Sequence, residues 1–266
     1  MTPASSPAAL AAPRAPAPGE PGYDASPRAE AARYALLRRL APALRHEAAA
    51  HLQPITMASS VLERRLAAPA PDLPQLRDGV LRLTGFSRSA VQTCLDLVGW
   101  LSPPQGARLP LAEAVARTTQ LLATPLAFDG FSLVQRLGEP ADGRAAAAPD
   151  ADRTSLSQQP VDANALRLVL PACLLWLTDQ AEPPLQVRVD AGPAGAGHLA
   201  LRLSLAAPPP PQEGYEKPKA GPRREPAYRR LGWSEVEALA REEGLDLSVR
   251  GQGAGAAVEV ALPLDP

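Results

Sequence analysis

The fold is decided by the stretch from residue 28 to residue 66, which reads RAEAARYALLRRLAPALRHEAAAHLQPITMASSVLERRL. Aliphatic and small residues recur in this stretch at alternating spacings of four and three, which is typical of a helix with one apolar seam. The seam positions are Leu37, Ala41, Leu44, Ala48, His51, Ile55, Ala58 and Leu62. The pattern predicts one long helix that ends at about Leu66.

A second seam follows a proline-rich turn at residues 67–74. Its positions are Leu76, Val80, Leu83, Ser87, Ala90, Cys94, Leu97 and Leu101. Two long helices joined by a short turn form an antiparallel hairpin, and a single hairpin leaves the apolar stripe of each helix half covered. We therefore expect two copies of the chain to pair into a four-helix bundle, which predicts a homodimer.

A different kind of sequence begins after Ser102, Pro103 and Pro104, which end the second helix. Helical patterns follow at residues 109–122, 164–178 and 233–243, and strand patterns at residues 132–137, 185–190, 198–205, 245–250 and 257–262. Polar loops are expected at residues 141–151 and from Pro208 to about residue 227. The fold class is therefore α+β: a helical hairpin domain at residues 28–102, followed by a helix-on-sheet α/β sandwich at residues 107–266.

Composition limits the classes of function. The chain carries 27 basic and 28 acidic residues, so no charge imbalance favours a nucleic acid partner. Residues 1–27 are mostly Ala, Pro, Ser and Gly, which predicts a disordered tail. Prolines interrupt the N-terminus and no stretch reaches about 20 apolar residues, so we expect no membrane segment and a cytoplasmic location. Cys94 and Cys173 each lie in an apolar run and are expected to be buried hydrophobic residues.

The three histidines are separated by their helical phase. His46 lies roughly 200° around the first helix from Leu44, at about 100° per residue, so it is expected to face solvent. An exposed imidazole can accept a phosphoryl group, and the adjacent Glu47 could orient the ring or accept its proton. A His-Glu pair is also common on solvated helix faces and does not establish a function by itself. His51 in the seam is expected to be packed and hydrogen-bonded, and His198 is assigned no function.

The residues that begin at His46 resemble a known motif. The stretch HEAAAHLQPI, from His46 to Ile55, resembles the H-box of bacterial two-component histidine kinases, in which a His-Glu or His-Asp pair precedes an apolar stretch. The resemblance implies that His46 is the phosphoacceptor and that Glu47 is its acid/base or orienting partner. The family often has Asn or Thr where this chain has Ala50, whose methyl group cannot hydrogen-bond to water. Phosphatase activity by that route is therefore not expected.

The second domain resembles the ATPase domain of the same family but departs from it at the nucleotide site. The likeness is carried by the apolar helix at residues 164–178 and by the ending GAGAAVEVALP at residues 253–263. The asparagines that ligate magnesium in the family correspond to Ala172 and Trp176, which cannot coordinate a hard cation. The adenine-binding Asp-x-Gly-x-Gly is replaced by AAPPPP at residues 206–211, and the glycine-rich lid is reduced to Leu231-Gly232-Trp233. We expect neither ATP nor magnesium as a cofactor.

These observations support one leading hypothesis and three alternatives. The leading one is a phosphotransfer protein in which His46 exchanges a phosphoryl group with the aspartate of a response-regulator receiver domain without using ATP. It resembles dimeric bacterial histidine phosphotransferases that have a hairpin dimer and a vestigial kinase domain. The alternatives are a pseudokinase scaffold that docks a receiver domain or a kinase, an active histidine kinase with a diverged nucleotide site, and an accidental likeness. Docking is expected around His46 and at Arg82, Arg88 and Gln92.

Overall fold

The computed structural model describes residues 26–101, 106–137, 156–194, 197–208, 229–251 and 253–264. Several predicted segments lie outside the described residues. They are the tail up to residue 25, the proline boundary at residues 102–105 and the polar loops at residues 141–151 and 209–227. The helices are α1 Pro27–Leu66, α2 Leu73–Val98, α3 Leu111–Phe128, α5 Ala163–Asp179 and α6 Trp233–Glu242, with a short 3₁₀ turn, η1, at Gly253–Gly255. The strands are β1 Arg108–Pro110, β2 Phe131–Arg136, β3 Pro160–Asp162, β4 Leu185–Pro193, β5 His198–Ala206, β6 Asp246–Arg250 and β7 Ala257–Pro263.

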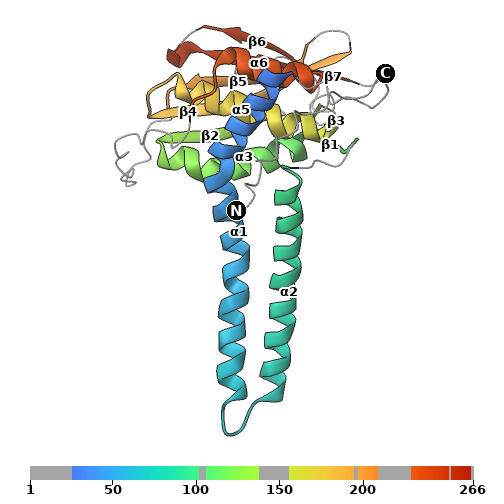
Figure 1. Ribbon diagram of the computed structural model, residues 1–266, viewed down its shortest axis with the longest axis vertical. Coiled ribbons are helices and arrows are strands. Elements are labelled where there is room, and N and C mark those ends of the chain that lie inside the picture. The colour runs from blue at the N-terminus through green and yellow to red at the C-terminus, as the bar shows by residue number, and fades with distance from the viewer. Residues whose placement is uncertain are drawn as a thin grey trace, which may run out of the picture.

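The helices α1 and α2 form the predicted antiparallel hairpin, which projects from the α/β part as a long stalk (Figure 1). The turn between them ends at Asp72, whose carboxylate accepts a hydrogen bond from the Gln75 backbone N–H at 3.1 Å. This contact caps α2, and Pro74 lies in the first turn, where its missing N–H breaks no helical hydrogen bond. Local sequence signals therefore account for the sharp reversal at the tip of the stalk.

The upper half of α1 packs against the α/β part and not against α2. Leu36 and Leu40 are completely buried in the common core, whereas the predicted seam position Ala41 is exposed. The seam prediction is therefore wrong at Ala41, because this half of α1 turns its apolar stripe toward α6, α3 and α5. From Leu44 to Leu62 every predicted seam position is at least half-buried.

The contact face of α2 also differs from the predicted seam. Gly79 and Ala90 are buried, while the predicted seam positions Val80, Cys94 and Leu101 are exposed in the single chain. Gly79 explains part of the difference, because it lies so close to Leu62 of α1 that an added Cβ would be 2.4 Å from a Leu62 methyl group. The small residue lets the two helices approach along the Gly79 face, and Val80 is left outside the contact.

The α/β part consists of a mixed five-stranded sheet with helices on one face (Figure 1). The strand order is β2-β4-β5-β7-β6, with β2 parallel to β4 and the other neighbours antiparallel. The strands β1 and β3, which the alternation pattern did not predict, form a separate two-stranded pair. The predicted α+β class, with a helical hairpin and a helix-covered sheet, is confirmed.

The helix α5 is the centre of the core. Its N-terminus is capped by the Asp162 carboxylate, which accepts hydrogen bonds from the backbone N–H groups of Asn164 and Ala165 at 2.8 and 3.1 Å. Most of its side chains are buried, including Pro171 within the helix, because the sheet covers one side and α1, α3 and α6 cover the others. A helix that is apolar on all sides is expected to be buried in this way.

Ion pairs of two arginines, Arg33 and Arg39, join α1 to the α/β part. The Arg39 guanidinium donates to both carboxylate oxygens of Asp179, the last residue of α5, and the contact to Oδ1 is 3.1 Å. Both side chains are largely buried, with exposed fractions of 10% for Arg39 and 3% for Asp179. Arg33 also donates to Glu243 at 2.6 Å, just after α6. The upper half of α1 is thus held by polar as well as apolar contacts.

None of the helices in the described ranges is long and apolar enough to cross a membrane.

The two cysteines differ in accessibility, which gives a test of the core. Cys173 on α5 is completely buried, and burial raises the pKa of its thiol, so the reactive thiolate is strongly disfavoured. Cys94 is exposed, and the prediction that it is buried is wrong for the single chain.

In a Cys94→Ser variant we expect no reaction with Ellman's reagent in the folded state and one thiol per chain after unfolding in guanidinium chloride. Rapid labelling of that variant without denaturant would contradict the burial of α5.

Candidate functional site

His46 lies on α1 just below the point at which this helix meets the α/β part. Its side chain is exposed, as the helical phase predicts, because the preceding Leu44 faces the core and His46 is on the other side of the helix. Within the described residues, the His46 imidazole makes no hydrogen bond or ion pair. The ring nitrogens are therefore accessible to an approaching protein.

Glu47 is paired with His51 and not with His46. Its Oε1 lies 3.3 Å from His51 Nε2, and both side chains are about two-fifths exposed, at 39% and 38%. In this structure the Glu47 carboxylate is turned toward His51, because consecutive residues point about 100° apart on a helix whereas residues four apart are neighbours. The role of Glu47 at His46 stays a prediction. The same contact gives His51 the polar partner that was expected of it.

The surroundings of His46 on the same helix face carry few polar groups. Ala50, one turn further along α1, is exposed and presents only its methyl group. The expected docking residues Arg82, Arg88 and Gln92 are all exposed on α2, and Gln92 donates to Asp96 at 3.2 Å. Arg82 and Gln92 are ten residues apart, which places them about 15 Å apart along α2.

The positions that correspond to the magnesium ligands hold apolar side chains packed in place. Ala172 is completely buried in the core. Trp176 packs on Trp233 across the junction of α5 and α6, with ring centroids 4.7 Å apart and a tilt of 52°. The Trp233 indole N–H donates to Glu237 at 2.6 Å, which fixes the orientation of the second ring. The tryptophan pair thus occupies the space between these two helices.

Other parts of the expected nucleotide site are only partly described. Leu231, from the reduced lid, is buried, and Gly232 is the N-cap residue of α6. Ala206 is the last residue of β5, residues 207 and 208 follow it, and residues 209–211 lie outside the described residues. Among the side chains that the structure describes, no group of three or more His, Cys, Asp or Glu is arranged to hold a metal ion.

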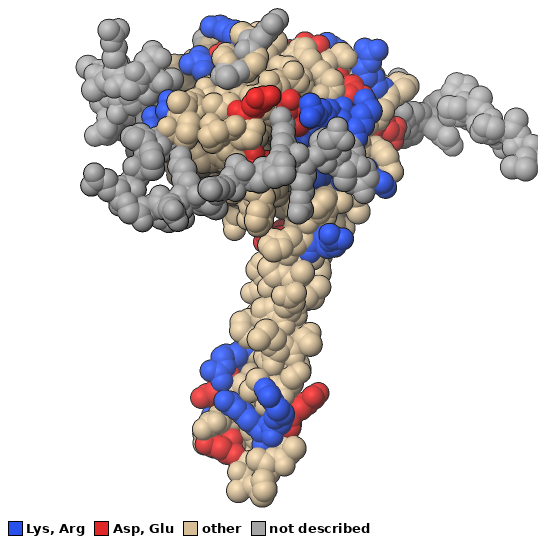
Figure 2. Space-filling view, turned by 90° about the vertical axis from the view of Figure 1, so that its left-hand side faces the viewer, with Lys and Arg blue, Asp and Glu red and all other residues tan. Residues whose placement is uncertain are grey.

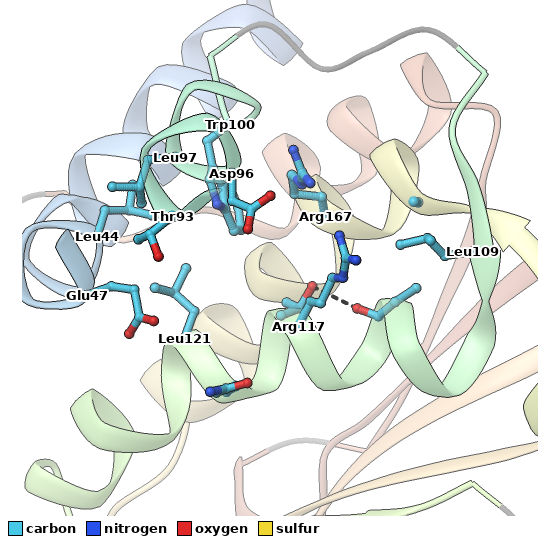
Figure 3. Close-up of a pocket in the computed structure, with 14 residues that line it drawn as sticks. Leu44, Glu47, Thr93, Asp96, Leu97, Trp100, Leu109, Arg117, Leu121 and Arg167 are labelled. Carbon is cyan, nitrogen blue, oxygen red and sulfur yellow. Dashed lines mark hydrogen bonds between the residues drawn. The ribbon is translucent and has the colours of Figure 1, made fainter. Parts of the chain in front are cut away.

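A pocket lies where the hairpin meets the α/β part, beside Glu47 (Figure 3). The hairpin contributes Glu47, Thr93, Asp96 and Trp100, and the α/β part contributes Arg117 from α3 and Arg167 from α5. These arginines were not predicted from the sequence. No local signal could have identified them, because the pocket residues come from four helices, from the turn after α2 and from β1, and they are far apart in the chain.

The chain was compared with known proteins by sequence and by structure. No protein-family model and no curated protein matches the sequence. Among solved structures, the chain is similar to the catalytic domain of histidine kinase ThkA, at 10% identity and a TM-score of 0.39, covering 59% of this chain and 95% of that one. It is also similar to the Acinetobacter baumannii histidine kinase AdeS, at 13% identity and a TM-score of 0.40, covering 80% and 98%. The mycobacterial sensor histidine kinase MprB gives 18% identity and a TM-score of 0.36, covering 60% and 99%. At these identities and TM-scores no function is transferred from these proteins to the chain.

Proposed function

We propose that this protein is a dimeric histidine phosphotransfer protein of two-component signalling. In this role His46 receives a phosphoryl group from the aspartate of one receiver domain and passes it to the aspartate of another. The observation that carries the proposal is an exposed imidazole that has no polar partner in the described part of the chain. It stands beside a domain in which a buried alanine and a packed tryptophan hold the positions that correspond to the family's magnesium ligands. The His46 imidazole is accessible to a partner protein. The two positions that would hold magnesium for ATP carry side chains that cannot coordinate a metal ion.

The proposed transfer needs only groups that the two proteins bring. One imidazole nitrogen of His46 attacks the phosphorus of the aspartyl phosphate, so a P–N bond forms while the P–O bond breaks and the aspartate leaves as a carboxylate. The proton on the other ring nitrogen becomes acidic and passes to water or to Glu47. For Glu47 to accept it, its side chain must leave His51 and rotate toward His46. The reverse sequence delivers the phosphoryl group to a second receiver.

The experiment that tests this function follows labelled phosphate from two sources. Purified protein is mixed with labelled ATP alone and, separately, with a labelled receiver domain. Label that arrives from a receiver and not from ATP is expected. Label from ATP alone would identify a working kinase and would contradict the proposed loss of the nucleotide site. No label from any member of a broad receiver panel would favour a scaffold that docks its partner without phosphoryl chemistry.

The surface of the hairpin supports the dimer. From Ala48 to Leu62 the sequence of α1 contains no Lys, Arg, Asp or Glu, and Figure 2 shows that the middle of the stalk is free of charged side chains on the face turned to the viewer. An exposed apolar stripe also runs along α2, within about 60° of arc at about 100° per residue. It consists of Leu73, Val80, Val91, Leu95 and Val98.

The direction of that stripe suits a four-helix bundle. It lies about a quarter turn from the Gly79 and Ala90 face, which already contacts α1. A helix in such a bundle contacts two neighbours at about this angular separation. A second hairpin seated on the stripe would leave His46 on the outside of the bundle, because His46 is exposed and lies about 200° around α1 from Leu44. The dimer and the accessible phosphoacceptor are therefore compatible.

A Val91→Glu substitution tests the dimer. Val91 is 60% exposed in the single chain, so glutamate there costs little in a monomer but would place a charge at the centre of the proposed bundle. We expect the variant to elute with the mass of one chain in size-exclusion chromatography with light scattering, while the unmodified protein has the mass of two. Ser89→Glu is the matched control, because Ser89 is exposed on the other side of α2. Equal masses for all three proteins would contradict this interface.

A further inference from the structure

The pocket at the junction of the hairpin and the α/β part has a volume of about 260 Å³, enough for a small molecule. Figure 3 shows Asp96 and Trp100 on one side of it and Glu47 further along the hairpin wall. The guanidinium of Arg117 rises from α3 toward Arg167 of α5 on the opposite side. The pocket is therefore built from both parts of the molecule and not from one element.

Arg167 lines this pocket, and one of its guanidinium N–H groups lacks a hydrogen-bond acceptor among the described residues. Its Nη1 is buried and has no hydrogen-bond partner in the part of the chain that the structure describes. The guanidinium is positioned by the Trp100 ring, 5.7 Å from its centroid, and by Gly99, where a Cβ would lie 2.4 Å from Nη1. Desolvation lowers the pKa of Arg167, and a guanidinium nevertheless stays charged at neutral pH. Among the described residues this N–H donor is thus fixed against Gly99 without an acceptor, which is costly. The Asp96 carboxylate balances part of the guanidinium charge.

The nearby carboxylates have hydrogen-bond or ionic partners other than this donor. Asp96 Oδ1 accepts from Gln92, and Glu47 is 3.3 Å from His51. Glu113 accepts from Arg117 at 2.7 Å on the exposed side of α3. After desolvation, the Asp96 carboxylate has the larger electrostatic effect on Arg167 and favours its charged form, while the positive charge of Arg117 opposes it more weakly. The two guanidinium groups therefore face one space together with one carboxylate. An anion placed between the guanidinium groups would reduce their mutual repulsion and accept hydrogen bonds from them.

We propose that this pocket binds a small free oxyanion, of the phosphate or carboxylate class, between Arg167 and Arg117. Guanidinium groups bind both kinds of oxyanion through paired N–H donors. The exposed amide of Gln120 lines the same space, as does Thr118, whose hydroxyl donates to the Ala114 carbonyl at 3.3 Å. The site does not include His46, although Glu47 lines the same pocket.

Occupation of this pocket would connect the hairpin to the α/β part. The anion would contact α5 and α3 while Trp100 and Asp96 close the hairpin side. A ligand that binds only the assembled arrangement stabilises it by mass action. We therefore expect the oxyanion to raise the melting temperature by about 3–6 °C at about ten times its dissociation constant.

The test uses titration calorimetry and thermal melting of the full chain with inorganic phosphate and, separately, with succinate, at ionic strength matched with sodium chloride. Binding of either probe is expected, and comparison of the two arms shows whether phosphate or carboxylate is preferred. Arg167→Gln should weaken binding at least about tenfold, because it removes a charge-assisted hydrogen bond. Arg117→Gln should also weaken it, and because Arg117 is exposed this variant is expected to fold normally. Arg77→Gln, which changes the same charge on the distant part of α2, should leave binding unchanged.

Two results would overturn the proposal. One is no heat and no shift in melting temperature with either probe up to about 10 mM, where a millimolar site would be largely filled. The other is equal binding by the unmodified protein and by both pocket variants, which would show that the anion associates elsewhere. Failure of the receiver transfer assay would not affect either measurement, because neither depends on His46.

Discussion

Replacing His46 with alanine is expected to abolish the transfer of label from a phosphorylated receiver, with a loss of at least about 100-fold against the unmodified protein. The alanine side chain has no nucleophile, and the P–N bond cannot form without an imidazole nitrogen. His46 is exposed, so the substitution should leave the melting temperature and the dimer unchanged. The measurement is the fraction of label on the protein after a short reaction with the labelled receiver. The bond type is checked by its lability in acid, which is characteristic of phosphohistidine.

The matched control for this experiment is His51→Ala. His51 lies five residues further along the same helix, and its Nε2 is already close to the Glu47 carboxylate. Removal of His51 should preserve labelling and, because it frees Glu47 to turn toward His46, should not slow the transfer. Label that survives in His46→Ala and disappears in His51→Ala would reverse the assignment of the phosphoacceptor. Labelling of both variants would place the reactive group outside this helix.

The sequence was sufficient to predict the hairpin, because its signals are local. Alternating spacings of four and three define each helix, and the prolines around residue 70 define the turn. The same local reasoning failed for the upper half of α1. Leu36 and Leu37, like Leu40 and Ala41, offer two apolar stripes one residue apart, and only contact with α6, α3 and α5 selects the first. Periodicity cannot make that choice, because it depends on residues distant in the chain.

For the candidate site, too, only the features that depend on local sequence could be predicted. The exposure of His46 follows from helical phase alone, and the structure places its side chain in solvent. The pairing of Glu47 with His51 depends on side-chain direction along the helix, which adjacency in sequence does not reveal. The arginine pocket could not be predicted, because Arg117 and Arg167 meet the hairpin only after α3 and α5 have packed against it.

Replacing Asp179 with alanine is expected to lower the free energy of unfolding by about 3–5 kcal/mol, the usual cost of breaking a buried ion pair by removing one partner. The Arg39 side chain is only 10% exposed, so it would remain as a buried cation without its carboxylate. The measurement is the denaturation midpoint in urea, followed by circular dichroism.

The control is Glu259→Ala, which breaks the Arg202–Glu259 pair between β5 and β7. That pair is 2.9 Å apart but far more exposed, at 44% and 24%, and its loss should cost less than about 1 kcal/mol.

The double variant Arg39→Leu/Asp179→Leu tests whether the stability lost in Asp179→Ala comes from the unpaired charge of Arg39 or from lost contacts. If the penalty of Asp179→Ala comes from an uncompensated buried cation, replacement of both partners by apolar side chains should recover most of the lost stability. Equal losses in the single and double variants would mean that this junction depends on the two hydrogen bonds and that an uncompensated cation is not the cause of the loss. A loss for Asp179→Ala no larger than that of the exposed control would show that the upper half of α1 is held without the Arg39–Asp179 pair, by its apolar contacts and by Arg33. In that case the hairpin could rotate against the α/β part without breaking a buried polar contact.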